Sequence, residues 1–469
     1  MSPSVALFVW FVLLVGLLWL DPAKDRGTSV ALWIPVIWMF IIGTRLPSQW
    51  FGGQMGQAAQ ALEEGNPLDR TISSALILLA FGIMMSRSFK WDVFLVRNLS
   101  LTAFLGFALL SVLWSDYPFV AFKRWFRDLG NYLVMLVAVS DPNPLEAVRA
   151  ILRRLCYLLI PLCILTIKYY PGISKQYDMW TGLASYSGVT TSKNMLGVVC
   201  LISGLFFFWD ILTRWPGRKE RRTRRILLVN IAFIAMTLWL LNMSDSATSR
   251  VCLVLGCLVI AAVHTKTARN HPALLKRLIP AGICAYVVLA FGFGFDISAE
   301  IARLVGRNPN LTDRTRIWLF LLGMNTNSLL GTGYESFWLG PRLQWFWRSA
   351  GLGRINEAHN GYLEIYLNLG LTGLTLLLGF LVTGYRTICE KLTTSKLASL
   401  AVGFWTVLLF YSVTEAGFRS GLMWLTFLLG TLTVSGHVRN QEQRLGKFSA
   451  VEETERRQLP PLEPVVPER

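Results

Sequence analysis

The chain has 469 residues, of which 53% are hydrophobic and only 16% are charged. This composition is too apolar for a soluble globular protein of that length and predicts a protein that crosses a membrane many times. Apolar runs of roughly 16 to 22 residues recur along almost the whole chain, about the length of a helix that spans a hydrocarbon core. The strands of a β-barrel would alternate apolar and polar residues instead, so we expect helices.

The formal net charge of +17 could indicate a nucleic-acid-binding protein. The basic residues, however, gather in short segments between apolar runs, where positive charge also sets membrane orientation. We therefore expect no nucleic-acid partner. The seven cysteines lie in or beside apolar segments, which argues against a disulfide scaffold. The N-terminus lacks the basic region and cleavage site of a signal peptide, so 4–20 is expected to be a retained first helix.

The apolar runs predict an all-α polytopic fold with about twelve or thirteen membrane crossings. The expected helices lie at 4–20, 29–44, 71–85, 98–114, 129–140, 151–168, 194–212, 226–241, 250–264, 278–295, 360–384, 397–413 and 420–436. Segment 129–140 is short for a crossing, and one of the first two helices is a candidate for partial insertion.

The connection RWPGRKERRTRR at 214–225 is dense in basic side chains, which favours the cytoplasm. Counting from it places the loops 169–192, 242–249 and 296–358 outside. The expected divisions are N-terminal helices at 1–192, core helices at 193–295, one large external loop at 296–358, C-terminal helices at 359–436 and a cytoplasmic tail at 437–469. The tail is charged and Pro-rich, which predicts disorder.

Lys193, Arg250 and His359 stand at the starts of expected helices that run inward, so they would meet at one outer face of the membrane. The backbone N–H groups of those helix starts would add partial positive charge there. Positive charge outside runs against the usual orientation rule and predicts an anionic partner. Further basic residues in expected external loops are Lys123, Arg124, Arg127, Arg303, Arg307, Arg314, Arg316, Arg342, Arg348 and Arg354.

His359 lies in NEAHNGYLEIYLNLG, where a polar stretch turns into an apolar helix, and it is the one histidine expected outside. A lone histidine at a helix entrance is more often a cap or a satisfied hydrogen-bonding group than a catalytic residue. On a continuous helix, Tyr362, Leu363 and Tyr366 would share its face, and aromatic rings there suit a sugar.

The arginine motifs also have simpler interpretations. Arg250 ends SDSATSR, where it could be an interfacial arginine that reaches water. Arg314 and Arg316 lie in LTDRTRIW, a possible surface helix in which they could pair with Asp313. GTGYESFW at 331–338 supplies glycines for a turn whose N–H groups could reach a phosphate, but this evidence is weak alone.

The sequence contains no GxxxxGK[ST] loop, no HExxH, no CxxC pair and no close DxD pair in the expected external loops. These absences argue against nucleotide hydrolysis and a structural zinc site, and we expect no metal and no cofactor. Any chemistry would have to draw its energy from the substrate.

Three motifs, in this order, resemble the O-antigen ligase and polysaccharide polymerase superfamily, which includes exopolysaccharide polymerases of bacterial inner membranes. They are SATSR, DRTRIW followed by GTGYESFW, and AHNGYLEIYLNLGLTGL, and they cover roughly 193–384. LWSDYP at 113–118 is also similar. The resemblance implies a metal-independent, inverting glycosyltransferase of the multi-helix membrane (GT-C-like) type, with its site on the periplasmic face of the inner membrane.

The resemblance further implies transfer of a glycan from a polyprenyl diphosphate, such as undecaprenyl diphosphate, to a hydroxyl of an acceptor glycan or lipid, alongside other polysaccharide-assembly proteins. By position, His359 corresponds to the family's loop histidine, and Arg250 and Arg314 to its two arginines. Asp313 stands where the family often has glycine, which leaves Arg316 as an alternative phosphate ligand. Lys193 is a further expected phosphate ligand, and the expected supporting residues are Asn360, Tyr362 and Tyr334.

Residue chemistry agrees with that interpretation. A guanidinium can stabilise the charge that grows on a departing diphosphate, and a neutral imidazole can accept the proton of a hydroxyl. A transporter or flippase would also need a positive outer cavity, but such folds usually show paired repeats and interrupted helices, neither of which is evident in the sequence. A non-catalytic assembly partner would leave the histidine and arginines without a role. The choice between polymerase and ligase stays open.

Overall fold

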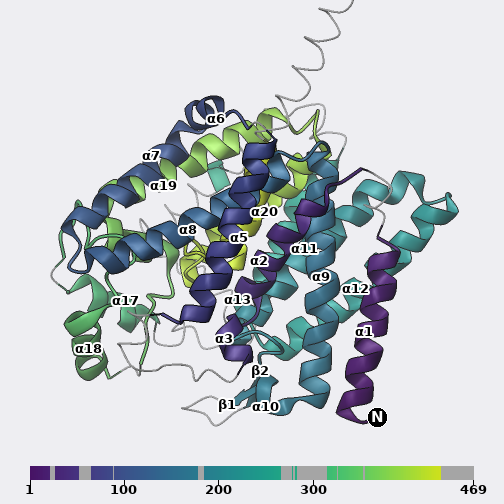
Figure 1. Ribbon diagram of the computed structural model, residues 1–469, viewed down its shortest axis with the longest axis horizontal. Helices are drawn as coiled ribbons and strands as arrows, with labels where there is room; N and C mark the ends of the chain where they lie inside the picture. Colours follow the sequence, from purple (N-terminus) through teal and green to yellow (C-terminus); the bar gives the residue numbers. More distant parts are fainter. Residues whose placement is uncertain are drawn as a thin grey trace, which may run out of the picture.

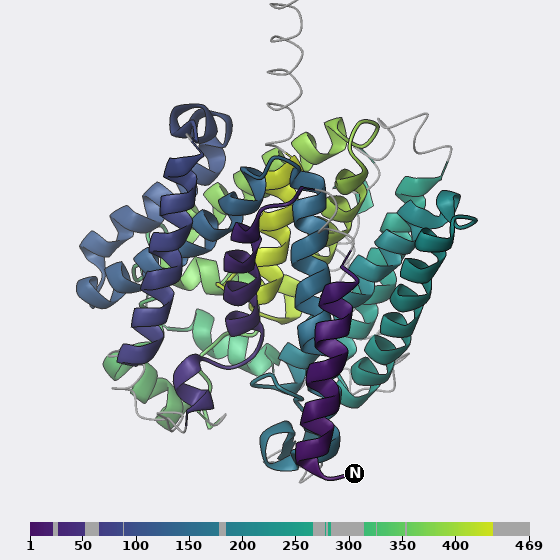
Figure 2. The same ribbon diagram turned by 45° about the vertical axis from the view of Figure 1, so that its right-hand side comes forward.

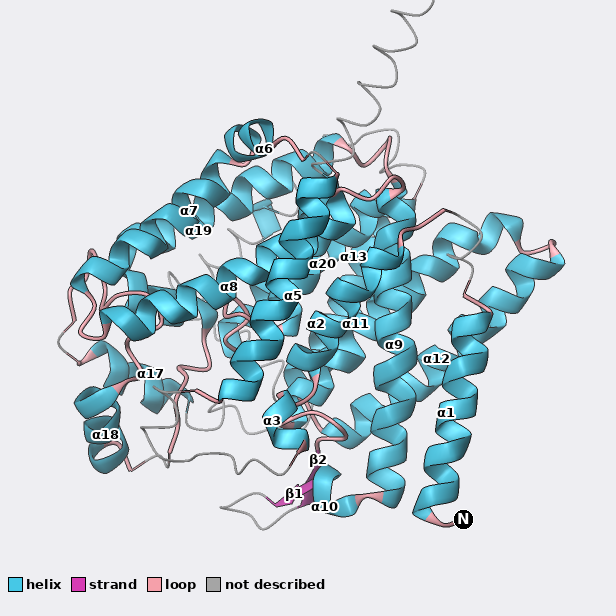
Figure 3. Ribbon diagram, viewed as in Figure 1, coloured by secondary structure: helices cyan, strands magenta, loops and turns pink. Residues whose placement is uncertain are grey.

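The computed structural model describes residues 1–21, 27–51, 65–87, 89–177, 184–265, 277, 280–282, 314–324, 326–351 and 354–434. Over these residues the chain is almost entirely helical, with one two-stranded hairpin (Figure 3). Seven helices are long and apolar enough to span a membrane, and an eighth span results if the bent pair at 91–97 and 99–114 is counted as one. The prediction of an all-α polytopic membrane protein is confirmed.

Helices of the first part of the chain often begin with proline, which stands within the first two positions of α1, α5, α8, α9 and α10. Proline suits these positions because the first N–H groups of a helix have no partner within it. The elements are α1 (Pro3–Trp19), η2 (Val30–Leu32), α2 (Trp33–Gly43), α3 (Pro47–Trp50), α5 (Pro67–Ser86), α6 (Trp91–Arg97), α7 (Leu99–Leu110), η3 (Ser111–Trp114), α8 (Pro118–Val139), α9 (Pro144–Tyr169) and α10 (Pro171–Ser174).

The second part begins with the hairpin, in which Gln176 lies opposite Ser185. Side-chain caps start two of its long helices, since Ser192 accepts from the N–H of Met195 and Asn360 from that of Leu363. The elements are β1 (Lys175–Tyr177), β2 (Ala184–Tyr186), α11 (Lys193–Arg214), η4 (Trp215–Gly217), α12 (Arg221–Ser244), α13 (Ala247–His264), α17 (Arg314–Leu322), α18 (Gly340–Ser349), α19 (Gly361–Glu390), α20 (Lys396–Thr414) and a last helix, Leu422–Val434.

The core of the bundle is built around α9, α11 and α20, whose side chains are mostly buried. α11 packs against α9, α12, α13 and α20, while α7 runs alongside α19 and α1 alongside α9 (Figures 1 and 2). The short elements α3, α10, β1 and β2 lie at one end of the molecule and α6 at the other (Figure 1). The starts of α11, α13 and α19 lie at the same end of the bundle as the end of α20. Side-chain contacts described below join them.

Several helices are longer than predicted. α8 begins at Pro118, so Lys123, Arg124 and Arg127 lie on a helix and not in the expected loop. α9 begins at Pro144, earlier than predicted. Its first turns are amphipathic and bury charged side chains, and a criterion based on hydropathy alone places such residues in water. Most of the expected helix 278–295, the expected loop from 296 to 313 and the tail 437–469 lie outside the described residues. The count of about twelve or thirteen crossings therefore stays a prediction.

α19 is interrupted at Gly370, which has a φ of +64°. The N–H groups of Leu371 and Thr372 donate to the carbonyls of Ser328 and Leu329 at 2.8 and 3.2 Å instead of continuing the helix. No interrupted helix was evident in the sequence, so only the structure reveals this break. The loop at 328–333 supplies the backbone groups that bond to the helix at this interruption.

The glycine turn of GTGYESFW docks on the same interruption. The N–H groups of Thr332 and Gly333 donate to the carbonyls of Leu367 and Asn368 at 3.1 and 2.9 Å. A Cβ atom on Gly331 would lie only 2.4 Å from the backbone of Asn368, so the close approach requires glycine there. Since its N–H groups bond to protein, this turn is not a phosphate-binding loop in the described structure.

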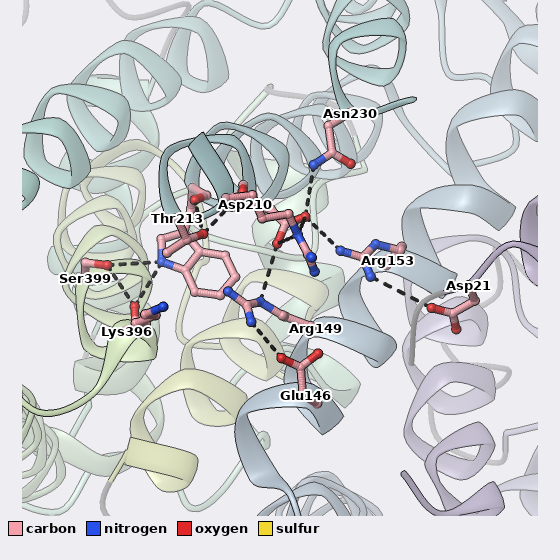
Figure 4. A network of polar contacts seen from close by, with 11 residues as sticks. Asp21, Glu146, Arg149, Arg153, Asp210, Thr213, Asn230, Lys396 and Ser399 are labelled. Atoms are coloured by element: carbon pink, nitrogen blue, oxygen red, sulfur yellow. Dashed lines mark hydrogen bonds and ion pairs between the residues drawn. The ribbon is translucent and has the colours of Figure 1, made fainter. Parts of the chain in front are cut away.

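A network of buried charges joins α1, α9, α11 and α12 at the opposite end of α11 (Figure 4). Asp210 accepts from Arg153, Arg214 and Asn230 at 2.7 to 2.9 Å, and Arg149 lies 3.4 Å from it. The other members are Arg154, Glu146 and Asp21. Buried charges are stable only when they are paired, so Asp210 is the shared counter-ion for arginines of α9 and α11.

We expect Asp210→Asn to lower the free energy of unfolding by about 3–5 kcal/mol, because it leaves buried guanidinium groups without their carboxylate. The thermal midpoint of the purified protein in detergent micelles measures this. The matched control is Asp116→Asn, whose carboxylate pairs with Arg342 at 2.7 Å but is 60% exposed. It should change stability by about 1 kcal/mol or less. Equal losses in the two variants would contradict the prediction.

Candidate active site

His359 stands just before α19 and not on it. Its φ is +48°, an uncommon left-handed backbone for a residue other than glycine, and the next residue, Asn360, caps the helix by accepting from Leu363 N–H at 3.0 Å. The expectation that Tyr362 and Tyr366 share a helical face with His359 was therefore wrong. A strained backbone at such a position persists only where its surroundings hold it.

The residue before His359 is held by three elements. Ala358 N–H donates to the Glu364 carboxylate at 2.5 Å, and the Ala358 carbonyl accepts from the Trp318 indole of α17 at 2.9 Å. The Trp338 indole donates to the other oxygen of Glu364 at 3.0 Å. Glu364 and both indoles thus fix the peptide that presents the imidazole.

The imidazole faces two carboxylates. His359 Nδ1 lies 3.0 Å from Glu357 Oε1 and 3.6 Å from Glu415 Oε2, and the side chain is 25% exposed. Burial disfavours the charged ring, but the two carboxylates outweigh it and raise the pKa of His359 to about 9. Burial likewise opposes ionisation of Glu357, yet His359 and nearby arginines hold its pKa below the ordinary value. At neutral pH the group is therefore an imidazolium between carboxylates.

Glu415, at the end of α20, connects this histidine to two other elements. Its Oε1 accepts from Arg314 of α17 at 2.5 Å and from Asn194 of α11 at 3.0 Å, while Oε2 faces His359. The sequence analysis missed Glu415. The signal was its place in TEAGFRSG, a short polar break between two apolar helices.

The two arginines of DRTRIW point in different directions. Arg314 is 13% exposed and pairs with Glu415. Arg316 instead reaches the backbone carbonyl of Ala350, with Nη2 at 3.5 Å. Of these alternatives, only Arg314 joins the group around His359.

Arg250 and Lys193 lie at the same end of the bundle but contact neither His359 nor Glu415 in the described structure. Arg250, in the first turn of α13, reaches the carbonyl of Asn242 at 3.3 Å and lies 3.5 Å from Asp245. Lys193 begins α11 and forms no ion pair with the described residues. Two hydroxyl side chains, Thr248 and Thr414, bond at 3.0 Å and bring the start of α13 beside the end of α20.

The two expected supporting tyrosines are anchored elsewhere. The Tyr362 hydroxyl donates to the carbonyl of Leu409 at 3.2 Å, and its ring meets Phe418 edge-on. The Tyr334 hydroxyl donates to Asp128 at 3.0 Å. Neither places its hydroxyl on the imidazole.

A second charged group, also missed from the sequence, holds the loop that carries His359. Arg419 donates to Glu335 at 2.9 Å and to the carbonyl of Asn356 at 3.4 Å. Arg124 of α8 donates to the backbone carbonyl of Glu335. Although burial opposes it, these arginines keep the pKa of Glu335 below its ordinary value. The group ties α8, the glycine turn and the connection after α20 together.

Glu357, His359 and Glu415 also offer donor atoms within 4.8 Å of one another, a set that could hold a divalent cation. Arg314 already uses one oxygen of Glu415, and a guanidinium beside a cation would repel it. The arrangement can therefore act in proton transfer beside a bound anion, with metal binding as the competing use.

Comparison with known proteins supports the resemblance predicted from the motifs. Residues 231–378 match the O-antigen ligase family, and this stretch contains Arg250, Arg314 and His359. The chain therefore carries an O-antigen ligase-like segment. It is also similar to the exopolysaccharide production protein ExoQ of Rhizobium meliloti (strain 1021), with 23% identity over 294 residues. That match covers 60% of this chain and 63% of ExoQ, less than two thirds of its length. The expected resemblance is confirmed, and Glu415 lies outside the matched stretch.

We expect carbethoxylation of His359 by diethyl pyrocarbonate, which requires the neutral ring, to rise with pH and to have its midpoint near pH 9. Initial rates would be followed by mass spectrometry in a protein whose other histidines, His264, His271 and His437, are replaced by glutamine. Glu415→Gln removes one carboxylate and should lower the midpoint, whereas the exposed control Glu220→Gln should not. A midpoint near 6.5 in the unaltered site would show that the carboxylates do not act on the ring.

Proposed function

We propose that this protein is a glycosyltransferase of the bacterial inner membrane that moves an oligosaccharide from a polyprenyl diphosphate to an acceptor hydroxyl in polysaccharide biosynthesis. The observation that carries the proposal is the contact of Arg314 and His359 with the two oxygens of one carboxylate, Glu415. The contact supports the proposal because a guanidinium suits phosphate binding and an imidazole suits proton transfer. The family match and the similarity to an exopolysaccharide production protein support it.

The donor would bind through its diphosphate. Arg314 is partly exposed beside His359, and Lys193 and Arg250 lie on neighbouring helix starts with part of their side chains accessible. Cations and helix N-termini attract a diphosphate, and a guanidinium stabilises the charge that it gains on leaving. The dense basic segment at 214–225 follows the far end of α11, which supports a periplasmic position for the site.

The acceptor would be activated by Glu357, His359 and Glu415 acting together. With a pKa near 9, only about one imidazole in a hundred is neutral at pH 7, so the ring alone is a poor base in this state. The carboxylates can take up its proton as the acceptor approaches, since coupled groups titrate as a unit. The hydroxyl oxygen then bonds to the anomeric carbon, the bond to phosphate breaks, the diphosphate leaves with the electron pair, and the unit keeps the hydroxyl proton.

A lipid-linked sugar transporter is the second candidate, favoured by the interruption of α19 at Gly370. Transporters use such breaks to form binding sites. Here the backbone of 328–333 bonds to the interrupted helix, which leaves the break without free groups for a substrate. The enzyme therefore remains the first choice.

We expect His359→Ala and Arg314→Lys each to abolish glycan transfer, because the first removes the proton acceptor and the second the bidentate phosphate contact. The assay incubates purified protein with a polyprenyl-diphosphate oligosaccharide and sizes the products. The matched control is Arg316→Lys, whose side chain reaches only Ala350 and which should retain transfer. A ladder of product lengths would indicate a polymerase. A single adduct on a lipid core would indicate a ligase. Full-length polymer from His359→Ala would refute the role of the histidine, and flux of intact donor without product would favour the transporter.

We also expect transfer to survive chelation by EDTA, because leaving-group charge is stabilised by arginine and not by a cation. The same assay is repeated after dialysis against the chelator. Loss of activity that magnesium restores would assign Glu357, His359 and Glu415 to a metal instead.

A further inference from the structure

A cavity of about 260 Å³ opens between α2, α5 and α8. Its lining is mixed. Trp38, Ile41, Ile42 and Leu46 make much of it apolar, and polar groups come from Asp128 and Asn131 of α8, Thr191 before α11 and Ser420 after α20. Polar groups inside a membrane protein are costly and mark functional sites. None of these residues belongs to the proposed transfer chemistry.

The wall of the cavity is preorganised. The indole of Trp38 donates to Asn131 at 2.8 Å, and the amide of Asn131 donates in turn to the Ser420 hydroxyl at 3.0 Å. Trp38 is 4% exposed and Asn131 1%, so both are fixed by packing. On the other side, Asp128 is held by Tyr334 at 3.0 Å. A site whose side chains are already held loses little entropy when a ligand binds.

Other lining groups are left for a ligand. Among the described residues, no protein group bonds to the hydroxyls of Ser73 and Thr191, both half-buried on the cavity wall. Arg127 lies 3.2 Å from Asp128 and is 56% exposed, so it can still donate outward. Hydroxyl, carboxylate, guanidinium and amide groups around an indole form a mixed donor and acceptor set. That set matches the hydroxyl groups and apolar faces of a sugar ring.

Two lining residues lie close in the chain to residues that contact the candidate site. Ser420 follows Arg419, which donates to the carbonyl of Asn356 in the loop of His359. Thr191 precedes α11, whose Asn194 bonds to Glu415. These links favour a glycan that reacts at His359 as the source of the ligand.

Two other occupants fit less well. An isolated anion would face the buried carboxylate of Asp128, and a polyprenyl chain would bury hydroxyl groups without partners. The volume lies just below the roughly 300–1,000 Å³ of sites for drug-sized ligands, which suits a single sugar residue. We propose that this cavity is a subsite for one sugar residue of the glycan, an inference that rests on the proposed transferase function.

The test fills the cavity from α5 with Ser73→Phe and removes one hydroxyl with Thr191→Val. The matched control is Ala75→Phe, on the same helix but exposed and outside the cavity. The probe is a lipid-free, phosphate-free oligosaccharide released from the polysaccharide of the bacterium that encodes this protein, and binding is followed by saturation-transfer NMR. Ser73→Phe should weaken binding at least about tenfold and Thr191→Val about three- to tenfold, and Ala75→Phe should leave it unchanged.

The transfer assay then shows whether the sugar in the cavity belongs to the donor glycan or to the acceptor glycan. With Ser73→Phe, a raised KM for the acceptor assigns the subsite to the acceptor glycan, and a raised KM for the donor assigns it to the donor glycan. Unchanged binding and unchanged KM values with Ser73→Phe overturn the subsite while the transferase proposal stands. His359→Ala should bind the oligosaccharide normally. If the unaltered protein binds it in this cavity but transfers nothing, the function fails and the sugar subsite survives.

Discussion

The carboxylate of Glu415 holds together parts of the chain that share no local sequence. It accepts from Arg314 on one oxygen and faces His359 with the other, and Asn194 adds the start of α11. A half-buried cation, a buried carboxylate and an imidazole within a few ångströms stabilise one another only as a set. The loop of His359, α17 and the end of α20 are therefore positioned mutually, and the position of each depends on the same carboxylate.

Charged side chains have different surroundings at the two ends of α11. At one end of α11, Asp210 neutralises arginines of α9 and α11 that are almost completely buried, and this network joins helices. At the other end, Lys193 and Arg250 remain partly accessible, and Arg314 has one carboxylate partner. The two groups of cations differ in their exposure to water. Only a cation that water can reach can exchange a protein partner for an anionic ligand.

The charge on the His359 ring at neutral pH alters the mechanism that a lone histidine base would have. A histidine with an ordinary pKa could act as a base alone, but the carboxylates of Glu357 and Glu415 keep this ring charged at neutral pH. In the proposed mechanism the proton-accepting group is the three residues together, of which Glu415 is the most buried. The cavity between α2, α5 and α8 would hold a sugar of the glycan that reacts at this unit.

The sequence alone determined the membrane class, the approximate positions of the described long helices and the motifs around Arg314 and His359, because apolar run length and local motifs are properties of contiguous residues. It could not identify Glu415, which lies 101 positions from Arg314, nor separate Arg314 from Arg316. The interruption of α19 at Gly370 was missed for the same reason, since the partner of the open backbone is the distant loop 328–333. Only tertiary packing decided these points, because each depends on groups brought together from separate helices, where burial and pairing set the charge of each group.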